Sequence, residues 1–324
     1  MKSVLNIGGN KDKHIDSSTH LLRFGILYLL ILLILFSSLV SDKFLTVGNC
    51  INVLRQASMT IMIALGMGMV IITGGIDLSV GSLAALVGVF VSGAITKWEW
   101  SVALAILFAL FIGVVFGCLN GFIISKFNIS PMIITLATMS AARGVAMLYN
   151  NGAQIVGLPP NFTFIGRGYI LGGIPIPVAI MLALALVIWF IMTKTLFGKY
   201  LYAIGGGEDI ARLAGINLIK TKIMCYAICS LCAAIAGVVY CARLNMGDPT
   251  IGSDFAMDAI ASVVLGGISL YGGSGKILGA VVGALFIAVL ANALNIIGVS
   301  SFWQLVVKAI VLIIAALIYS ERKN

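Results

Sequence analysis

Charged residues are scarce in this chain. Lys, Arg, Asp and Glu make up 10% of its 324 residues, hydrophobic residues make up 61%, and the mean hydropathy is +1.14. A soluble domain carries roughly 25% charged residues, so this chain cannot cover itself with a solvated surface. The composition therefore excludes a soluble globular fold and predicts a protein surrounded largely by lipid.

Residues that hold metals or do covalent chemistry are also few. Both histidines, His14 and His20, lie near the N-terminus, far along the chain from Cys225, Cys229 and Cys232. These cysteines share one face of an apolar run, and we interpret them as small packing residues rather than as metal ligands or a disulfide framework. No HExxH or GxSxG motif occurs. The sequence predicts no metal site and no enzymatic activity of its own.

One glycine-rich segment, residues 270–277, has only a superficial likeness to a phosphate-binding loop. Such a loop needs a glycine five residues before the Gly-Lys pair and a Ser or Thr after the lysine, but these positions hold Leu270 and Ile277. We therefore expect no cofactor in this chain, and ATP with Mg²⁺ would be bound by a separate subunit. The net charge of +9 does not indicate nucleic-acid binding, because the basic residues form no continuous stripe.

Long apolar runs dominate what is present. A helix needs about 20 apolar residues to cross a bilayer, so the runs predict an all-α polytopic membrane protein of about ten transmembrane helices in the region 21–319. Residues 1–20 are a polar tail without a cleavable signal, and 320–324 are a second tail. The predicted spans are 21–40, 53–73, 78–96, 101–125, 130–149, 174–193, 220–242, 256–271, 277–297 and 302–319.

The basic residues predict the orientation. With the N-terminus inside, thirteen basic residues fall in cytoplasmic segments and two, Arg143 and Lys308, fall within spans. Cytoplasmic segments of membrane proteins are enriched in Lys and Arg, so both termini are predicted to be cytoplasmic. Five basic residues remain for the outer segments, namely Lys43, Arg55, Lys97, Arg167 and Arg243.

Glycine spacing predicts close helix packing. Gly113, Gly117 and Gly121 recur at every fourth residue, as do Gly275, Gly279 and Gly283, and this spacing lets two helix backbones approach closely. Each of the pairs Gly74-Gly75 and Gly272-Gly273 is followed by a further glycine, at 81 and 279. This arrangement is either an internal repeat or a coincidence in a glycine-rich chain.

Three of the charged residues in or beside spans call for an explanation, namely Asp77, Arg143 and Lys308. Asp77 stands just before the third span, where it caps that helix or serves a functional role. Arg143 and Lys308 each lie about two turns inside the outer end of a span. Snorkelling to the interface and a place in a transport pathway explain these two positions equally well.

Two long connections separate the spans, 150–173 outside and 194–219 inside. In the inner one, a Gly205–Gly207 hinge, the acids Glu208 and Asp209 and a stop at Gly215 predict a short helix with Ile210, Leu213 and Ala214 on one face. That apolar face needs a groove on a partner protein or, alternatively, the membrane surface. We therefore treat this loop as the candidate coupling element.

These segments resemble one known family. The sequence resembles the permease subunits of bacterial ABC-type importers for ribose, xylose, galactose and related monosaccharides, and it looks most similar to ribose permeases. The resemblance covers nearly the whole chain after residue 40. It rests on the motifs GGIDLSVG (74–81), FGKYLYAIGG with ARLAGIN (197–217), MDAIASVVLGGISLYGGSGKILG (257–279) and LNIIGVSSFWQLVVKA (294–309).

The resemblance implies a function and a set of partners. The chain would be the permease of an ATP-driven importer in the cell inner membrane, moving a monosaccharide, ribose foremost, by alternating access. A cytoplasmic ATP-binding subunit, an extracytoplasmic sugar-binding protein and a second permease copy, identical or paired, would complete the complex. The alternatives are an importer permease for an autoinducer, amino acid or vitamin and, further off, an ion-coupled secondary transporter, which would need intramembrane carboxylates.

The resemblance also assigns residues, with two departures from the family pattern. Gly207 stands where the family commonly has asparagine, and residues 290–295 read LANALN instead of LNNGLN; neither change removes a charge or adds a proline. The ATPase-coupling residues would be Gly198, Lys199, Tyr200, Gly205, Gly206, Glu208, Ala211, Arg212, Leu213, Gly215, Ile216 and Asn217. The structural motif residues would be Gly74, Gly75, Asp77, Ser79, Gly81, Asp258, Gly272, Gly273, Gly275 and Gly279.

Overall fold

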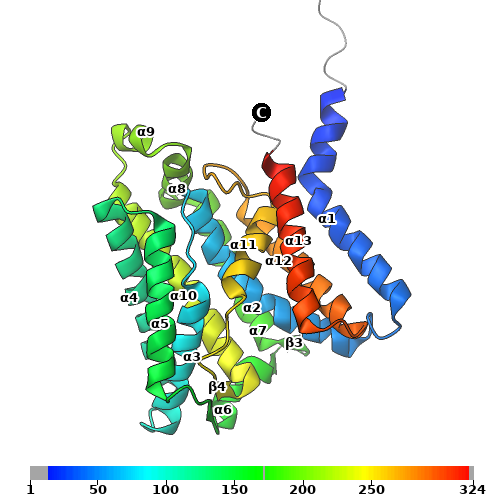
Figure 1. Cartoon of the computed structure of the whole chain (residues 1–324), viewed down its shortest axis with the longest axis vertical. Helices are drawn as coiled ribbons and strands as arrows, with labels where there is room; N and C mark the ends of the chain where they lie inside the picture. The colour runs from blue at the N-terminus through cyan, green and yellow to red at the C-terminus, as the bar shows by residue number, and fades with distance from the viewer. Residues whose placement is uncertain (1–13, 171, 321–324) are drawn as a thin grey trace, which may run out of the picture.

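The computed structural model describes residues 14–170 and 172–320, and the described part is almost entirely helical (Figure 1). Its four strands have two residues each: β1 (Ile155–Val156), β2 (Tyr169–Ile170), β3 (Ile174–Pro175) and β4 (Met246–Gly247). Its helices are α1 (His14–Val40), α2 (Val47–Ile72), α3 (Val80–Thr96), α4 (Val102–Phe127), α5 (Pro131–Tyr149), α6 (Pro160–Arg167), α7 (Ile176–Lys194), α8 (Leu196–Gly206), α9 (Glu208–Leu213), α10 (Leu218–Leu244), α11 (Phe255–Leu265), α12 (Ile277–Ile296) and α13 (Ser301–Ser320).

The apolar helices match the predicted spans. Within the described residues, α2, α4, α5, α7, α10 and α12 are long and apolar enough to cross a membrane. The other four predicted spans fall on shorter apolar stretches in α1, α3, α11 and α13. The all-α polytopic fold is thereby confirmed.

The predicted span 256–271 is wrong as a full crossing. Helix α11 has 11 residues and ends at Leu265, and at 1.5 Å per residue it covers only about half of a ~30 Å hydrocarbon core. A turn follows at once, with φ +84° at Gly267, which favours glycine. A Cβ on Gly266 would come within 2.5 Å of the Ala280 nitrogen, so the short helix turns back tightly against α12.

The two ends of the described chain lie on the same side of the bundle. His14 begins α1 and Ser320 ends α13 at the end where α8 and α9 lie, whereas α6 and β4 lie at the opposite end (Figure 1). The predicted tails fall mainly on residues 1–13 and 321–324, outside the described residues. In the predicted outer loop, β1 pairs antiparallel with β4, and β2 pairs with β3.

The centre of the bundle is α2, and the outer helices are open on one face. In the most apolar 18-residue stretch of α2, 83% of the residues are buried. In the corresponding stretches of α4, α5 and α7, only 22%, 17% and 28% are buried. Helix α10 packs against α4, α2 and α3 and joins them into one core. The open faces of α4, α5 and α7 are apolar, as contact with lipid or another subunit requires.

The first glycine strip packs as predicted. A Cβ on Gly113 would lie 2.6 Å from the Ala234 Cβ, and one on Gly121 would lie 2.6 Å from the Ile223 Cα. The strip therefore lets α4 approach α10 closely. The prediction of a second strip is wrong at Gly275, which precedes α12. Gly279 and Gly283 do pack against α11.

Candidate functional site

The predicted helix outside the spans is present as α9 (Glu208–Leu213) and ends in a glycine turn. The Gly215 N–H donates to the Arg212 carbonyl (3.0 Å), and the Ile216 N–H donates to the Ala211 carbonyl (3.1 Å), which together form a Schellman motif. Gly215 has φ +80°, a conformation that glycine adopts without strain. The predicted stop at Gly215 is thereby confirmed.

The apolar face of α9 points away from the protein. The exposed fractions are 72% for Ile210 and 89% for Leu213, whereas Ala211 is 1% exposed and anchors the helix. Ala214, the third predicted member of the face, is also exposed. Large apolar side chains gathered on one exposed helix outside the spans mark a surface that another molecule covers.

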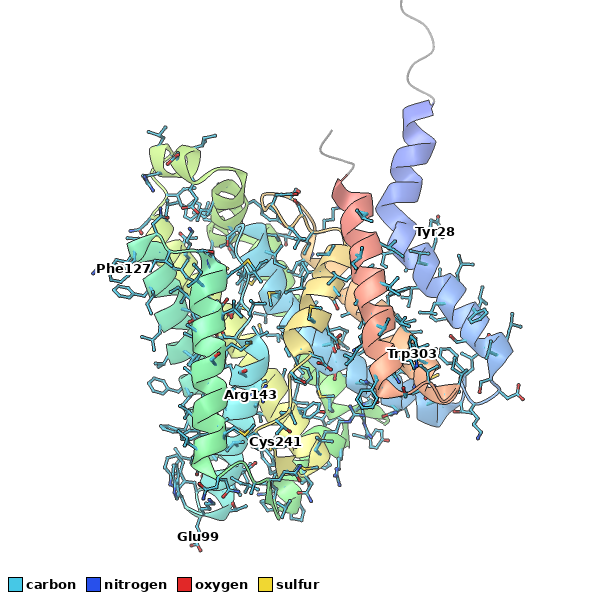
Figure 2. All side chains as sticks on the ribbon, in the orientation of Figure 1. Tyr28, Glu99, Phe127, Arg143, Cys241 and Trp303 are labelled. Carbon is cyan, nitrogen blue, oxygen red and sulfur yellow. The ribbon has the colours of Figure 1, made fainter. Side chains whose placement is uncertain are left out.

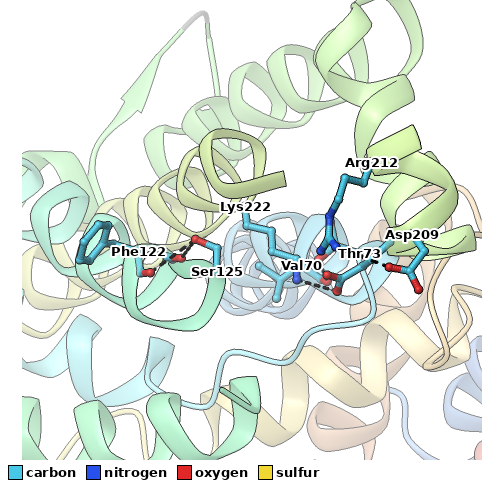
Figure 3. Close-up of polar contacts among 9 residues, drawn as sticks. Val70, Thr73, Phe122, Ser125, Asp209, Arg212 and Lys222 are labelled. Atoms are coloured by element: carbon cyan, nitrogen blue, oxygen red, sulfur yellow. Dashed lines mark hydrogen bonds and ion pairs between the residues drawn. The ribbon is translucent and has the colours of Figure 1, made fainter. Parts of the chain in front are cut away.

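One ion pair ties α9 to α10. The Lys222 Nζ lies 2.6 Å from Glu208 Oε1, and the Lys222 residue is only 8% exposed (Figure 3). The other pair in this helix, Asp209 with Arg212 at 3.7 Å, is largely exposed and contributes little to stability. The sequence gives no sign of this ion pair, because the pairing depends on how α10 folds back beside α9.

The predicted glycine hinge is mostly wrong. Gly205 and Gly206 belong to α8, and only Gly207 separates α8 from α9. A Cβ on Gly205 would collide with the Ile72 carbonyl oxygen and the Gly273 nitrogen. Gly205 is therefore a point of close backbone contact, which holds α8 firmly instead of letting it swing.

Backbones from three segments meet around Gly205. The Ile72 carbonyl at the end of α2 accepts a hydrogen bond from the Gly273 N–H (2.9 Å), and a Cβ on Gly272 would lie 2.9 Å from the Gly74 nitrogen. We call Gly74, Gly205, Gly272 and Gly273 the glycine junction. Through it α8, which carries α9, touches both the end of α2 and the turn between α11 and α12.

A matched pair of substitutions tests the glycine junction. We expect Gly205→Ala to destabilise the protein by about 1–3 kcal/mol, because the added methyl overpacks a backbone contact. Gly206→Ala should be neutral or slightly stabilising, because nothing lies within 4 Å of a Cβ there and alanine favours a helix. Thermal unfolding in detergent measures both, and equal midpoints for the two variants would show that Gly205 is not a point of close backbone contact.

Asp77 is fully buried between α2 and α3. Its Oδ1 accepts hydrogen bonds from the Ser79 N–H (2.9 Å) and hydroxyl (2.5 Å), and the Asn120 amide donates to the Ser79 hydroxyl (3.1 Å). Because α3 begins at Val80, Asp77 bonds the residue that precedes the helix and not an N–H of its first turn. The capping prediction is corrected accordingly: Asp77 fixes the entry into α3 through Ser79.

Lys308 does not snorkel. Its Nζ lies 2.9 Å from Asp258 Oδ2, and the side chains are 20% and 16% exposed, so the pair joins α13 to α11 within the apolar layer. Asp258 was assigned only as a motif residue. The sequence separation of 50 residues gave no sign of this pairing, which depends on the packing of α13 beside α11.

Arg143 does not snorkel either. Its Nη1 donates to the carbonyl oxygens of Pro249 and Ile251, the latter at 2.8 Å. The segment that it holds contains Asp248, whose carboxylate accepts from Thr250 and Gln154. Burial raises the pKa of Asp248, but these hydrogen bonds and the charge of Arg143 outweigh burial and lower the pKa below its ordinary value. The carboxylate is therefore ionised at neutral pH.

Metal chemistry finds no support in the described part of the chain. No group of three or more His, Cys, Asp or Glu residues there could hold a metal ion. All six cysteines are unpaired, and Cys225, Cys229 and Cys232 are buried in α10. The exposed face of α9, the glycine junction and the buried charged groups are thus the features that a function must explain.

Comparison with known proteins identifies the family to which the chain belongs. Residues 49–316 match the family described as "Branched-chain amino acid transport system / permease component". The chain belongs to this permease family. The permease is 43% identical to the ribose import permease protein of Escherichia coli (strain K12) over 91% of this chain and 92% of the relative. It is 44% identical to that of Bacillus subtilis (strain 168), over 91% of each chain.

A relative named for another sugar also matches. The permease is 34% identical to the xylose transport system permease protein of Haemophilus influenzae (strain KW20), over 91% of this chain and 94% of the relative. No solved structure matches. These relatives confirm the resemblance to sugar importer permeases.

The family motifs converge in the permease. The segments 74–81, 197–217 and 257–279 all contribute to the glycine junction, and the fourth, 294–309, supplies Lys308 for the pair with Asp258. Other assigned residues have local roles: the Asn217 side chain accepts from the Lys220 N–H (3.0 Å) and so caps α10. Lys199 and Tyr200 are exposed on α8.

Proposed function

We propose that this chain is the membrane-spanning permease subunit of an ATP-driven importer that moves a monosaccharide, ribose foremost, inward by alternating access. The full-length relatives named for ribose and xylose support a sugar over an autoinducer, amino acid or vitamin. In this proposal the permease does no bond chemistry, and a separate cytoplasmic subunit binds and hydrolyses ATP. Both termini are cytoplasmic, and the ten apolar helices lie in the cell inner membrane.

The exposed apolar face of α9 carries the proposal. Leu213 and Ile210 stand outside the spans on a helix fixed by the Lys222–Glu208 pair and by the glycine junction. A helix that lies on lipid usually has basic residues along its polar face, whereas α9 opens with Glu208 and Asp209. A groove on the ATP-binding subunit therefore suits α9 better than a membrane surface. Movement of that subunit would reach α2 and the α11–α12 turn through α8.

The outer end supports docking of an extracytoplasmic binding protein. Arg55 donates to the Arg167 carbonyl (2.7 Å), Arg167 donates to the Arg243 carbonyl (2.7 Å), and Arg243 donates to the Asn52 side chain (2.9 Å). None of the three guanidinium groups forms an ion pair with a carboxylate of the described residues. Three oriented positive charges of this kind favour an acidic partner surface.

Transport in proteoliposomes tests the proposal. The permease is reconstituted with its ATP-binding subunit and its sugar-binding protein, and uptake of labelled ribose, xylose and leucine is measured with and without ATP. We expect ATP-dependent uptake of a sugar that also requires the binding protein. Uptake of leucine alone, or sugar uptake driven by an ion gradient without ATP, would contradict the proposal.

Reporter fusions test the proposed orientation. A reporter active only outside the cytoplasm should be active when it is fused at Pro160, the first residue of α6, and inactive at Glu208, the first residue of α9. The two sites lie at opposite ends of the bundle (Figure 1), and the excess of basic residues at the α9 end favours a cytoplasmic position for that end. Activity at Glu208 would reverse the map.

A further inference from the structure

A cavity of about 520 Å³ opens beside Arg143. It lies between the entry to α3, the middle of α5 and the segment that leads into α11, and its volume falls within the roughly 300–1,000 Å³ of small-molecule sites. Arg143 lies between the two ends of the bundle marked by Phe127 and Glu99 (Figure 2). The residues that matter in its lining are Leu78, Ser82, Met139, Ser140, Arg143 and Ser253.

The Arg143 guanidinium is held in place by hydrogen bonds, but not all of its N–H donors are used. Both of its hydrogen bonds, to Pro249 and Ile251, come from Nη1. A guanidinium has five N–H donors, so Nε and Nη2 keep three donors for which the described residues provide no acceptor. Asp248 forms no ion pair with it, and that carboxylate accepts hydrogen bonds from Thr250 and Gln154 instead. The arginine therefore presents free donors at a lining position of the cavity.

The open side of the cavity lies on the exposed face of α5. Ser140 and Gly144, which line the cavity, are exposed residues of this helix, and Gly144 has nothing within 4 Å of a Cβ. Free guanidinium donors facing hydrocarbon would be costly. In the membrane this face must therefore be covered by protein, with a water-filled space left between the two surfaces. Small residues on α5 allow another helix to approach closely, so the second permease copy of the proposed complex fits this role.

We propose that this cavity is a sugar-contacting site in the translocation path, completed by the second copy of the chain. This inference rests on the proposed importer function. The free N–H groups of Arg143 donate to adjacent hydroxyl oxygens of a neutral monosaccharide, the hydroxyls of Ser82, Ser140 and Ser253 supply further partners, and Leu78 and Met139 face its C–H surface. Because ionised Asp248 offsets the charge of Arg143, the site suits a neutral polyol better than a carboxylate-bearing solute.

Cysteine protection in the reconstituted complex tests this site. In a background that carries Cys50→Ser and Cys118→Ala, Ser140→Cys should react with a water-soluble cationic thiol reagent added from outside. Reaction should abolish uptake, and ribose delivered by the binding protein should slow it, whereas the same concentration of leucine should not. Leu107→Cys on the exposed face of α4 is the matched control and should neither react nor lose uptake.

A second variant measures the arginine itself. Loss of hydrogen bonds from a charged donor costs about 1.5–3 kcal/mol, so Arg143→Gln should lower the maximal rate of ribose uptake by about tenfold or more. If the background complex imports ribose but Ser140→Cys does not react, or reacts equally with and without ribose, the site is wrong while the importer function stands. If the background complex itself imports no sugar, the proposed function has failed instead. Should Arg143→Gln not assemble, the cysteine result decides.

Discussion

Replacing Leu213 by aspartate should uncouple the permease from its ATPase and leave the membrane bundle intact. Leu213 is 89% exposed on α9 and touches no part of the core. Burying a leucine side chain in a partner's groove contributes about 1.5–3 kcal/mol, so losing it should weaken docking by about tenfold or more. Co-purification of the ATPase in detergent and uptake of labelled sugar should both fall.

The same helix provides the controls. Leu213→Met keeps an apolar side chain of similar volume and should retain docking and uptake. Arg212→Ala removes an exposed charge whose contact with Asp209 is long, and it should leave the stability of α9 nearly unchanged. Normal ATPase binding and transport by Leu213→Asp would show that α9 is not the coupling element. Gly215 is a poor target, because a side chain at its φ of +80° would disturb α9 itself.

Replacing Lys308 by methionine should destabilise the permease strongly. The change leaves the Asp258 carboxyl without its positive partner within the apolar layer, and removing one partner of a buried ion pair costs about 3–5 kcal/mol. We expect a large drop in the thermal unfolding midpoint and in the yield of folded protein from detergent extracts. The double variant Asp258→Asn/Lys308→Met should recover much of the loss, because no unpaired charge remains.

The parent protein, the two single variants at 258 and 308 and the double variant form a double-mutant cycle. This cycle separates the contribution of the ion pair from that of side-chain packing. A coupling free energy near zero between positions 258 and 308 would show that the two residues act independently. Lys126→Met is the control, since Lys126 lies at the end of α4 over the ring of Phe122 (5.0 Å). Its loss should change the free energy of unfolding by less than about 0.5 kcal/mol.

The sequence predicted the helices well because apolar length is a local property. Each predicted span fell on an apolar helix, and the stop at Gly215 followed from glycine chemistry alone. The error at 256–271 has the same origin. The sequence continues to be apolar past Leu265, but the chain turns there, because Gly267 has a positive φ and α12 lies close enough to Gly266 to require glycine.

The candidate site was predictable only in part. The apolar face of α9 is a pattern within ten residues, so periodicity indicated it. The pairs Lys222–Glu208 and Lys308–Asp258, and the contact of Arg143 with the 249–251 segment, join residues 14 to 108 positions apart. No local pattern specifies such pairings. The hinge predicted at Gly205 is wrong for this reason: the sequence shows a missing side chain, and only the fold shows that backbone atoms fill its place.

The glycine junction also sets how motion can pass through the permease. Side chains at an ordinary helix contact occupy several rotamers, and a small displacement can be taken up by rotation about their bonds. At Gly205, Gly272 and Gly273 there are no such bonds, because peptide groups touch peptide groups. A shift of α8 that side-chain rotation would otherwise absorb must therefore move the main chain of α2 and of the α11–α12 turn by a similar amount, so that the three segments behave as one stiff body.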